Sequence, residues 1–249
     1  MSTMNKMARV CLAAPGRESS MKTVSLHLCL TGSYLHDICE LVCKAIGNGR
    51  VKSVELALPT KKADLDCGNM VAKNLVCFFY AFPNLLQCTT RLVLHNARFN
   101  ELEMCHLLNS CEQLQHLELN NCDTGRLSTL KINMPNSKIS YLRLESCCFE
   151  KVELSCLPKL AILYCESWFS LNAPLSFGCV PCLEELSLVC SAARNQYGLN
   201  LSELLHGTVE IKALTLDFHG EKVKNSYACY YSFCYHVASA GVGNRTRTC

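Results

Sequence analysis

Charged side chains are scarce in this sequence: only 18% of its 249 residues are Asp, Glu, Lys or Arg, whereas 49% are hydrophobic. A disordered chain has the opposite balance, with low hydrophobicity and high net charge, so the composition excludes one. The net charge of +3 is too small and too mixed in sign for a nucleic-acid-binding surface. We therefore expect a globular chain with a substantial core and no nucleic-acid partner.

The sequence also lacks an apolar run of the roughly 18 residues that a membrane-spanning helix needs. A short apolar run at 7–15 turns polar at 16–20, without the apolar region and cleavage site of a secretory signal. These absences predict a cytoplasmic or nuclear protein with no membrane partner, in which thiols stay reduced.

Catalytic motifs are missing as well. The sequence contains no phosphate-binding loop, no Gly-x-Ser-x-Gly nucleophile motif and no His-Glu-x-x-His zinc motif. A Cys–His pair cannot be excluded by spacing, because its partners meet only in the fold. With 20 cysteines and 8 histidines, however, some pairs are expected to meet by chance. We predict that the chain is not an enzyme and carries no cofactor.

Cysteine, in contrast, is abundant, at a density that is typical of disulfide scaffolds in secreted proteins. In a reducing compartment a free cysteine instead acts as a small buried hydrophobe. A zinc site would need four ligands, typically two close pairs. Cys179 and Cys182 form one close pair without a second, and the trio Cys229, Cys234 and His236 is one ligand short. We therefore predict no metal site.

One short phrase recurs along the chain: an apolar residue, two variable residues, an apolar residue, one variable residue, an apolar residue, two more residues and a small residue. The clearest copies lie at 114–122, 139–147, 157–165 and 183–191, and looser copies lie at 51–59, 89–97 and 211–219. Each copy alternates apolar and variable residues, which predicts a short strand with one buried face. The phrase is therefore a structural repeat.

The spacing of the copies indicates the fold. The central apolar residues of successive copies are 38, 25, 25, 18, 26 and 28 residues apart. Most of these spacings are close to the length of a leucine-rich repeat, which is about 20–29 residues. Helical spacing predicts helices at 34–46, 72–82 and 101–111, whereas 127–132 and 149–154 resemble extra short strands. The predicted fold is an α/β leucine-rich-repeat solenoid, with a parallel sheet on its concave face and mixed helices and short strands on its convex face.

The last residue of each phrase is small, and these residues are Ala97, Cys122, Cys147, Cys165 and Ser191. In a leucine-rich repeat this position lies inside the turn, where a thiol or hydroxyl can satisfy backbone groups. The repeat therefore accounts for part of the cysteine excess without a disulfide or a metal.

The segments 51–58, 114–125, 157–160, 174–181 and 214–218 resemble the leucine-rich region of plant F-box proteins, most closely the divergent set found in grasses. In that family an N-terminal F-box docks a Skp-type adaptor of a cullin–RING ubiquitin ligase, and the repeats capture the protein to be ubiquitinated. The resemblance covers roughly residues 22–223 and implies a protein–protein interaction module that recognises such targets.

The sequence departs from the family before and after the repeats. An F-box begins with a Leu-Pro phrase ahead of the repeats, but the Leu-Pro pairs here, at 58–59 and 157–158, lie inside repeats. We therefore expect no F-box and no Skp-type adaptor partner. The repeat pattern also stops near Lys224.

Three parts are expected: a flexible N-terminal segment 1–21, a repeat domain 22–223 and an irregular tail 224–249. Two alternatives stay open at this point. One is a cysteine-rich protein that is metal-stabilised or redox-active, and the other is a truncated or alternatively spliced fragment without function.

Variable residues between the apolar anchors of each strand point to the concave face. The predicted protein-binding residues on this face are Arg91, His95, His116, Glu118, Tyr141, Arg143, Lys159 and Glu185. Neighbouring strands lie about 4.8 Å apart, which places Glu118 beside Arg143 and Lys159 beside Glu185. Such pairs alone are ordinary cross-strand charge pairing. His116, Tyr141 and Arg143 are predicted as the central anchors of a binding surface.

Overall fold

The computed structural model describes residues 21–30, 35–59, 68–124, 129–166, 175–189, 204–206, 208 and 210–217. Eight parallel strands form one sheet in chain order: β1 (Met21–His27), β2 (Val51–Pro59), β3 (Thr89–His95), β4 (His116–Asn120), β6 (Tyr141–Glu145), β8 (Ile162–Glu166), β10 (Glu185–Val189) and β11 (Ala213–Asp217). A second parallel sheet holds β5 (Thr129–Asn133), β7 (Lys151–Cys156) and β9 (Leu175–Cys179). The expected N-terminal segment and C-terminal tail lie almost wholly outside the described residues and stay predictions.

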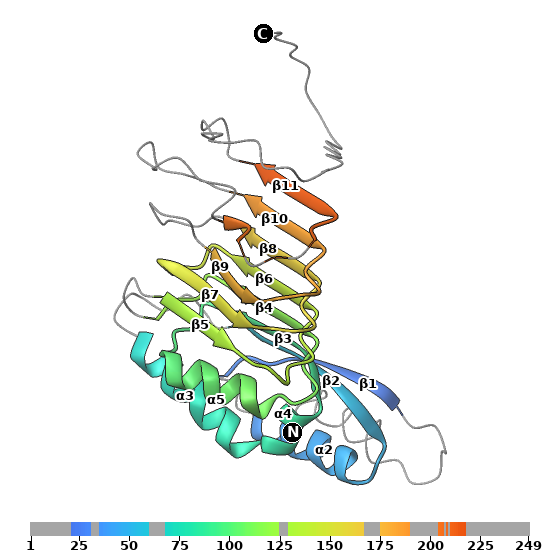
Figure 1. The fold of residues 1–249 in the computed structure, drawn as a ribbon. Helices are drawn as coiled ribbons and strands as arrows, with labels where there is room; N and C mark the ends of the chain where they lie inside the picture. The colour runs from blue at the N-terminus through green and yellow to red at the C-terminus, as the bar shows by residue number, and fades with distance from the viewer. Residues whose placement is uncertain are drawn as a thin grey trace, which may run out of the picture.

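The chain winds as a solenoid, in which the described return segments, those that follow β1, β2, β3, β4, β6 and β8, lie on the same side of the large sheet (Figure 1). The early return segments are helical: α2 (Leu35–Gly47), α3 (Gly68–Ala81), α4 (Pro83–Gln87) and α5 (Glu101–Ser110). The later ones are the strands of the small sheet. The predicted parallel-strand solenoid is therefore confirmed. Helices α2, α3 and α5 and strands β5 and β7 lie close to where the spacing predicts them.

The core lies between the large sheet and the return segments. Each central strand sends two apolar side chains inward, and the pairs, none more than 4% exposed, are Leu92 and Leu94, Leu117 and Leu119, Leu142 and Leu144, Leu163 and Cys165, and Leu186 and Leu188. Buried side chains of the small sheet pack into the same core: Leu130, Ile132, Val152, Leu154, Leu175 and Phe177. Each buried leucine stabilises the fold by about 1.5–3 kcal/mol relative to an exposed one.

The strand register corrects one repeat of the sequence analysis. Ile162 pairs with Tyr141 on one side and with Glu185 on the other. Leu163 is therefore the equivalent of Leu142, 21 residues earlier, and not Leu160 as the predicted alignment requires.

The error arises because the run Leu160-Ala161-Ile162-Leu163 fits the repeated phrase in two frames. Leu160 is fully buried, but it lies just before β8 instead of within it. Cys165, predicted to lie in the turn, is instead the second core anchor of β8.

Strands β3, β4 and β6 end in the same turn. The turn residues Asn96, Asn121 and Ser146 have φ angles of 51°, 52° and 52°, a conformation that asparagine adopts more readily than most residues. Their backbone N–H groups donate to the strand-end carbonyls of Asn120, Glu145 and Glu166 at 2.9, 2.8 and 3.0 Å. The Asn121 side chain also donates to Asn96 Oδ1 at 2.5 Å. The turns are thereby stacked on one another.

Cysteines stabilise these turns from inside. The Cys122 and Cys147 thiols donate to the backbone carbonyls of Leu94 and Leu119, at 3.6 and 3.2 Å. The role predicted for the small residue of the phrase is confirmed at these two positions. Ala97 occupies the same place and is buried. Ser191 lies outside the described residues.

All fourteen described cysteines are free thiols, and five of them are buried core residues: Cys39, Cys111, Cys122, Cys147 and Cys165. Burial raises the pKa of Cys111 to about 12. Burial and the neighbouring Cys43 thiol raise the pKa of Cys39 to about 12 as well. Since the thiolate is the reactive form, these two thiols are protected twice, by exclusion of solvent and by protonation.

Substitution of Asn121 tests the turn stack. Asn121→Gly keeps the positive φ without strain and loses only the side-chain bond, whereas Asn121→Ala also places a Cβ in the left-handed region. We expect the glycine variant to lower the free energy of unfolding by about 1 kcal/mol and the alanine variant by about 2 kcal/mol. Urea unfolding of both variants measures this, and a glycine variant less stable than the alanine variant contradicts the account.

Thiol labelling tests the burial of the cysteines. At pH 8, iodoacetamide is expected to modify the exposed Cys148 and Cys182 while leaving Cys39 and Cys111 unmodified. The same reaction in 6 M guanidinium, as a control, modifies all of them, and peptide mass spectrometry reads each site. Labelling of Cys39 in the folded protein at the rate of Cys182 would show that this core is not formed.

Candidate functional site

One face of the large sheet carries the candidate site. All described return segments cover the other face, and no described helix or strand lies over this one (Figure 1). We call it the open face and define it by the outward side chains of the eight strands. Because the strands are parallel and in register, these side chains form three rows across the sheet.

The first row comprises Ser25, Glu55, Arg91, His116, Tyr141, Ile162, Glu185 and Ala213. The second row comprises His27, Ala57, Val93, Glu118, Arg143, Tyr164, Ser187 and Thr215. The third row comprises Pro59, His95, Asn120, Glu145, Glu166, Val189 and Asp217. Each row is a continuous line of side chains that a partner laid across the strands would contact.

Glu118 is the electrostatic centre of the open face. Arg91 Nη2 donates to Glu118 Oε1 at 2.6 Å, and His116 Nε2 lies 2.5 Å from the same oxygen. Partial burial acts to raise the pKa of Glu118, but the hydrogen bond from His116 and the charge and hydrogen bond of Arg91 outweigh it. The pKa of Glu118 therefore lies below its ordinary value of 4.5, and the group is ionised at neutral pH.

Aromatic rings continue from this centre across the next two strands. The rings of His116 and Tyr141 are stacked, with centroids 3.9 Å apart and planes 7° from parallel. Tyr141 in turn contacts Tyr164, with centroids 5.6 Å apart and planes tilted by 45°. Burial and the nearby charge of Glu118 raise the pKa of Tyr141, although a hydrogen bond with Arg143 opposes them. We call these three rings the aromatic ribbon.

Arg143 forms ion pairs with two carboxylates of the third row, Glu145 and Glu166. Its Nη2 atom lies 3.2 Å from a Glu145 carboxylate oxygen and 3.1 Å from a Glu166 carboxylate oxygen. Its Nε atom and Asn120 Oδ1 are buried and have no hydrogen-bond partner within the described residues. Buried polar atoms without a partner cost stability, so proteins tolerate them mainly where function requires them.

A hollow lies beside this group, over β1 to β4. Its volume is about 400 Å³, and its lining includes His27, Glu55, Ala57, Arg91, Val93, His95 and Glu118. The hollow exists because Ala57 and Val93 in the second row are short, whereas the residues on either side of them are long. It thus has an apolar floor and a polar rim, the combination that is typical of sites that receive one side chain or a small ligand.

The structure brings seven of the eight predicted site residues onto the open face. Glu118 and Arg143 are direct register partners, as predicted. Lys159 is wrongly placed by the prediction: it is exposed in the turn before β8, and Glu185 pairs with Ile162 instead.

The same register error hides two site residues. In the predicted frame, with Leu160 as the central anchor, Leu163 faces outward; in the structure it is fully buried, whereas Tyr164 and Glu166 occupy the open face. A signal was present in the sequence, because the correct frame gives repeat steps of 21 and 23 residues, more even than 18 and 26. His27 and Glu55 were missed because the early copies of the phrase are loose.

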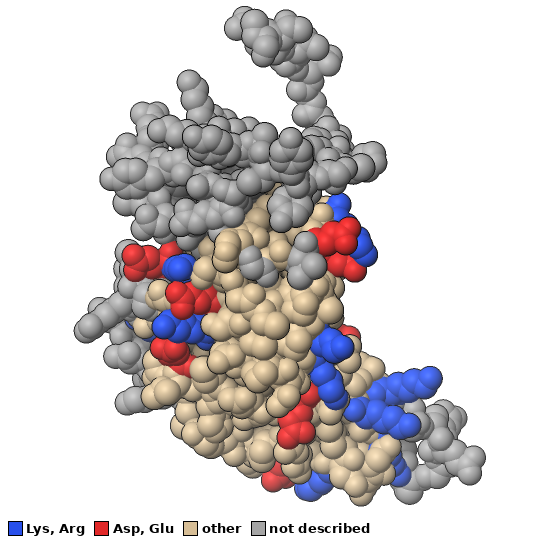
Figure 2. Space-filling view, in the orientation of Figure 1, with Lys and Arg blue, Asp and Glu red and all other residues tan. Residues whose placement is uncertain are grey.

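Outside the open face, Figure 2 shows a mixed group of charges beside β5 and β7, a basic group beside β1 and β2, and a further mixed group where β10 and β11 begin. The first includes Lys131 and Lys151, which lie 3.7 and 3.4 Å from the Glu153 carboxylate. Exposed pairs of this kind contribute little to stability and indicate no binding site.

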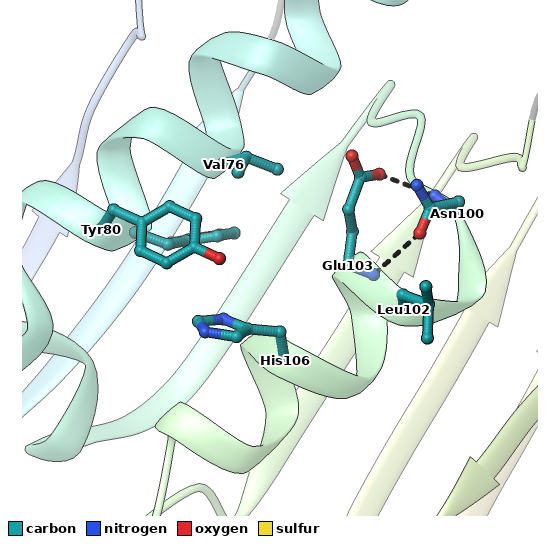
Figure 3. A pocket seen from close by; sticks show the side chains of 7 residues that line it. Val76, Tyr80, Asn100, Leu102, Glu103 and His106 are labelled. Carbon is teal, nitrogen blue, oxygen red and sulfur yellow. Dashed lines mark hydrogen bonds between the residues drawn. The ribbon is translucent and has the colours of Figure 1, made fainter.

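A smaller hollow of about 230 Å³ lies between α3 and α5 (Figure 3). Tyr80 and Leu102 line it and are 65% and 81% exposed. Its acidic and amide groups are committed elsewhere: Asn100 Oδ1 accepts from the Glu103 backbone, and the Glu103 carboxylate accepts from the Asn100 backbone. This is the capping box that begins α5, so these two residues have a structural role.

The described residues form neither a metal site nor a membrane-spanning helix. Within the described residues, no three His, Cys, Asp or Glu side chains form a group that could hold a metal ion. Cys179 and Cys182 are both exposed, and the trio Cys229, Cys234 and His236 lies outside the described residues. Among the described helices, none has the length and apolar character needed to cross a membrane.

Comparison with known proteins adds no assignment. No family model, no curated protein and no solved structure matches this chain. The geometry of the open face is therefore the evidence for function.

The acid response of Glu118 tests the electrostatic centre. Because its folded-state pKa is depressed, its stabilising effect is present above the unfolded-state pKa and is lost as pH falls through the folded-state value. We expect Glu118→Gln to lower the free energy of unfolding at pH 7 by about 0.5–1 kcal/mol and to cost less at pH 3. Urea unfolding at both pH values measures the difference. A cost that is the same at pH 3 and pH 7 contradicts this assignment.

Proposed function

We propose that this chain is a non-enzymatic protein-interaction module that binds a protein partner through its open face. The face combines aromatic rings, arginines and partly buried ion pairs, the groups that dominate the binding energy of protein interfaces. On the side of the return segments the described residues form a smaller hollow, of about 230 Å³, in which Asn100 and Glu103 are engaged in the capping box of α5.

The observation that carries the proposal is the continuity between the hollow and the aromatic ribbon. Arg91 and Glu118 form part of the rim of the hollow, and Glu118 contacts His116, where the ribbon begins. A partner side chain in the hollow would therefore have its neighbouring residues against Tyr141 and Tyr164. An anchoring pocket beside flat aromatic contacts is the usual arrangement at the centre of a protein interface.

The partner class is part of the proposal and rests on the resemblance to the repeat region of plant F-box proteins. With β8 in its correct frame, the steps from Leu92 to Leu214 are 25, 25, 21, 23 and 28 residues, all within the about 20–29 residues of a leucine-rich repeat. This regularity supports the likeness. We propose that the bound protein is a target of a cullin–RING ubiquitin ligase in the cytoplasm or nucleus.

Paired substitutions test the proposal. The double variant Arg91→Ala/Tyr141→Ala removes one rim residue of the hollow and the centre of the ribbon, whereas Lys131→Ala removes an exposed charge from the small sheet and serves as the control. We expect the open-face variant to weaken binding of a captured partner by about two to three orders of magnitude, since it removes two anchors that contribute about 2 kcal/mol each. The control should bind like the unmodified chain.

The measurement has two steps. Plant-cell proteins are first captured with the unmodified chain and identified by mass spectrometry, and one recombinant partner is then titrated against all three chains by calorimetry. Circular dichroism and melting curves confirm that the variants are folded. Partners that bind the double variant as tightly as the unmodified chain would refute binding through the open face.

A further inference from the structure

Two cysteines on the side of the solenoid opposite the open face lie next to each other. Cys156 at the end of β7 and Cys179 at the end of β9 are direct register partners. Neighbouring strands are about 4.8 Å apart, which is within the range of about 4.4–6.8 Å that a disulfide spans between Cα atoms. The two thiols are already hydrogen-bonded to each other. The pair thus needs little movement to form a bond.

The strands also come unusually close one residue before the thiols. A Cβ atom added to Gly178 would lie 2.4 Å from the carbonyl oxygen of Ser155 and 3.1 Å from its Cα. Only glycine fits at this distance, so the sequence permits a close approach of the two backbones at this point. Since a disulfide requires Cβ atoms closer than strand neighbours usually are, this approach favours the bond.

Cys156 and Cys179 differ in solvent exposure from Cys122 and Cys147, a second pair of neighbouring thiols. Cys122 and Cys147 are also hydrogen-bonded to each other, but both are buried, and their thiols donate to backbone carbonyls within the turns. Cys179 is exposed and Cys156 is half-buried. A small oxidant in solution can therefore reach Cys179 but not the buried pair.

We propose that Cys156 and Cys179 are a redox-sensitive pair that a small-molecule disulfide, such as oxidised glutathione, converts to an intramolecular disulfide. The Cys179 thiolate attacks one glutathione sulfur, which breaks the glutathione disulfide and releases one glutathione thiolate. The Cys156 thiolate then attacks Cys179 Sγ and expels the second glutathione. The protein loses two protons and two electrons, and one molecule of oxidised glutathione becomes two of the reduced form.

The electrostatics fit this order of attack. Burial and the neighbouring Cys179 raise the pKa of Cys156, so Cys156 is a poor first nucleophile. Once Cys179 is bonded to glutathione it has no thiol left to ionise, so its effect on the pKa of Cys156 ends. The exposed thiol therefore reacts first and the half-buried thiol resolves the intermediate.

The disulfide would act on the part of the solenoid that carries Tyr164, which makes one of the two ring contacts of the aromatic ribbon. The chain between Cys156 and Cys179 contains β8, which places Tyr164 and Glu166 on the open face. Closing this loop reduces the freedom of the unfolded chain and stabilises the turn. Oxidation would thus stabilise the part of the solenoid that carries Tyr164 against unfolding, without adding any contact to the open face.

The test uses the full chain, incubated at pH 8 with excess oxidised glutathione and analysed by mass spectrometry without reduction. We expect a mapped Cys156–Cys179 cross-link in the unmodified chain and in Cys182→Ser, which is the control for a neighbouring exposed thiol. Cys179→Ser should form no such cross-link. Cys156→Ser should accumulate one glutathione on Cys179, because the resolving thiol is absent. The oxidised chain should melt about 5 °C higher than the reduced one.

Two results would overturn the proposal. One is a stable glutathione adduct on Cys179 in the unmodified chain, which would show that Cys156 cannot reach it. The other is a disulfide from Cys179 to any other cysteine as the main product. Binding of a protein partner plays no part in this experiment, so its outcome is independent of the proposed function.

Discussion

The structure depends on the in-register stacking of parallel strands. Because Leu117 lies beside Leu142 and Leu142 beside Leu163, every inward position of one strand meets an inward position of the next, and the core is continuous along the solenoid. The turns preserve this register. Asn96 and Asn121 repeat the same left-handed conformation, and their backbone N–H groups donate to the end of the following strand. A shift by one residue would exchange the core and the open face.

The same register creates the open face, which we propose as the binding surface. Since all described return segments cover one side of the large sheet, the outward rows on the other side have only each other as neighbours among the described residues. Arg91, Glu118 and His116 therefore pair among themselves, and His116 stacks on Tyr141. These contacts hold the side chains in fixed positions before any partner arrives, which lowers the entropic cost of binding.

Much of the strand register could be predicted from the sequence, because aligned copies of the repeat show which residues of neighbouring strands lie side by side wherever the alignment is unambiguous. Glu118 and Arg143 were placed side by side in this way, but the run from Leu160 to Leu163 fits two frames, so Tyr164 was missed. The hollow could not be predicted, since it depends on how Ala57 fits between longer neighbours. Nor could the thiol pair on β7 and β9, because the return segments share no common phrase that would align them.

Photocrosslinking shows whether a protein binds at the open face. A photoreactive benzoylphenylalanine is placed at Tyr141 in one chain and at Lys131, on the small sheet, in another, and both are irradiated in plant cells. We expect a discrete crosslinked protein from position 141 and none from position 131. Crosslinking from position 131 alone would contradict it and would assign binding to the opposite side of the solenoid.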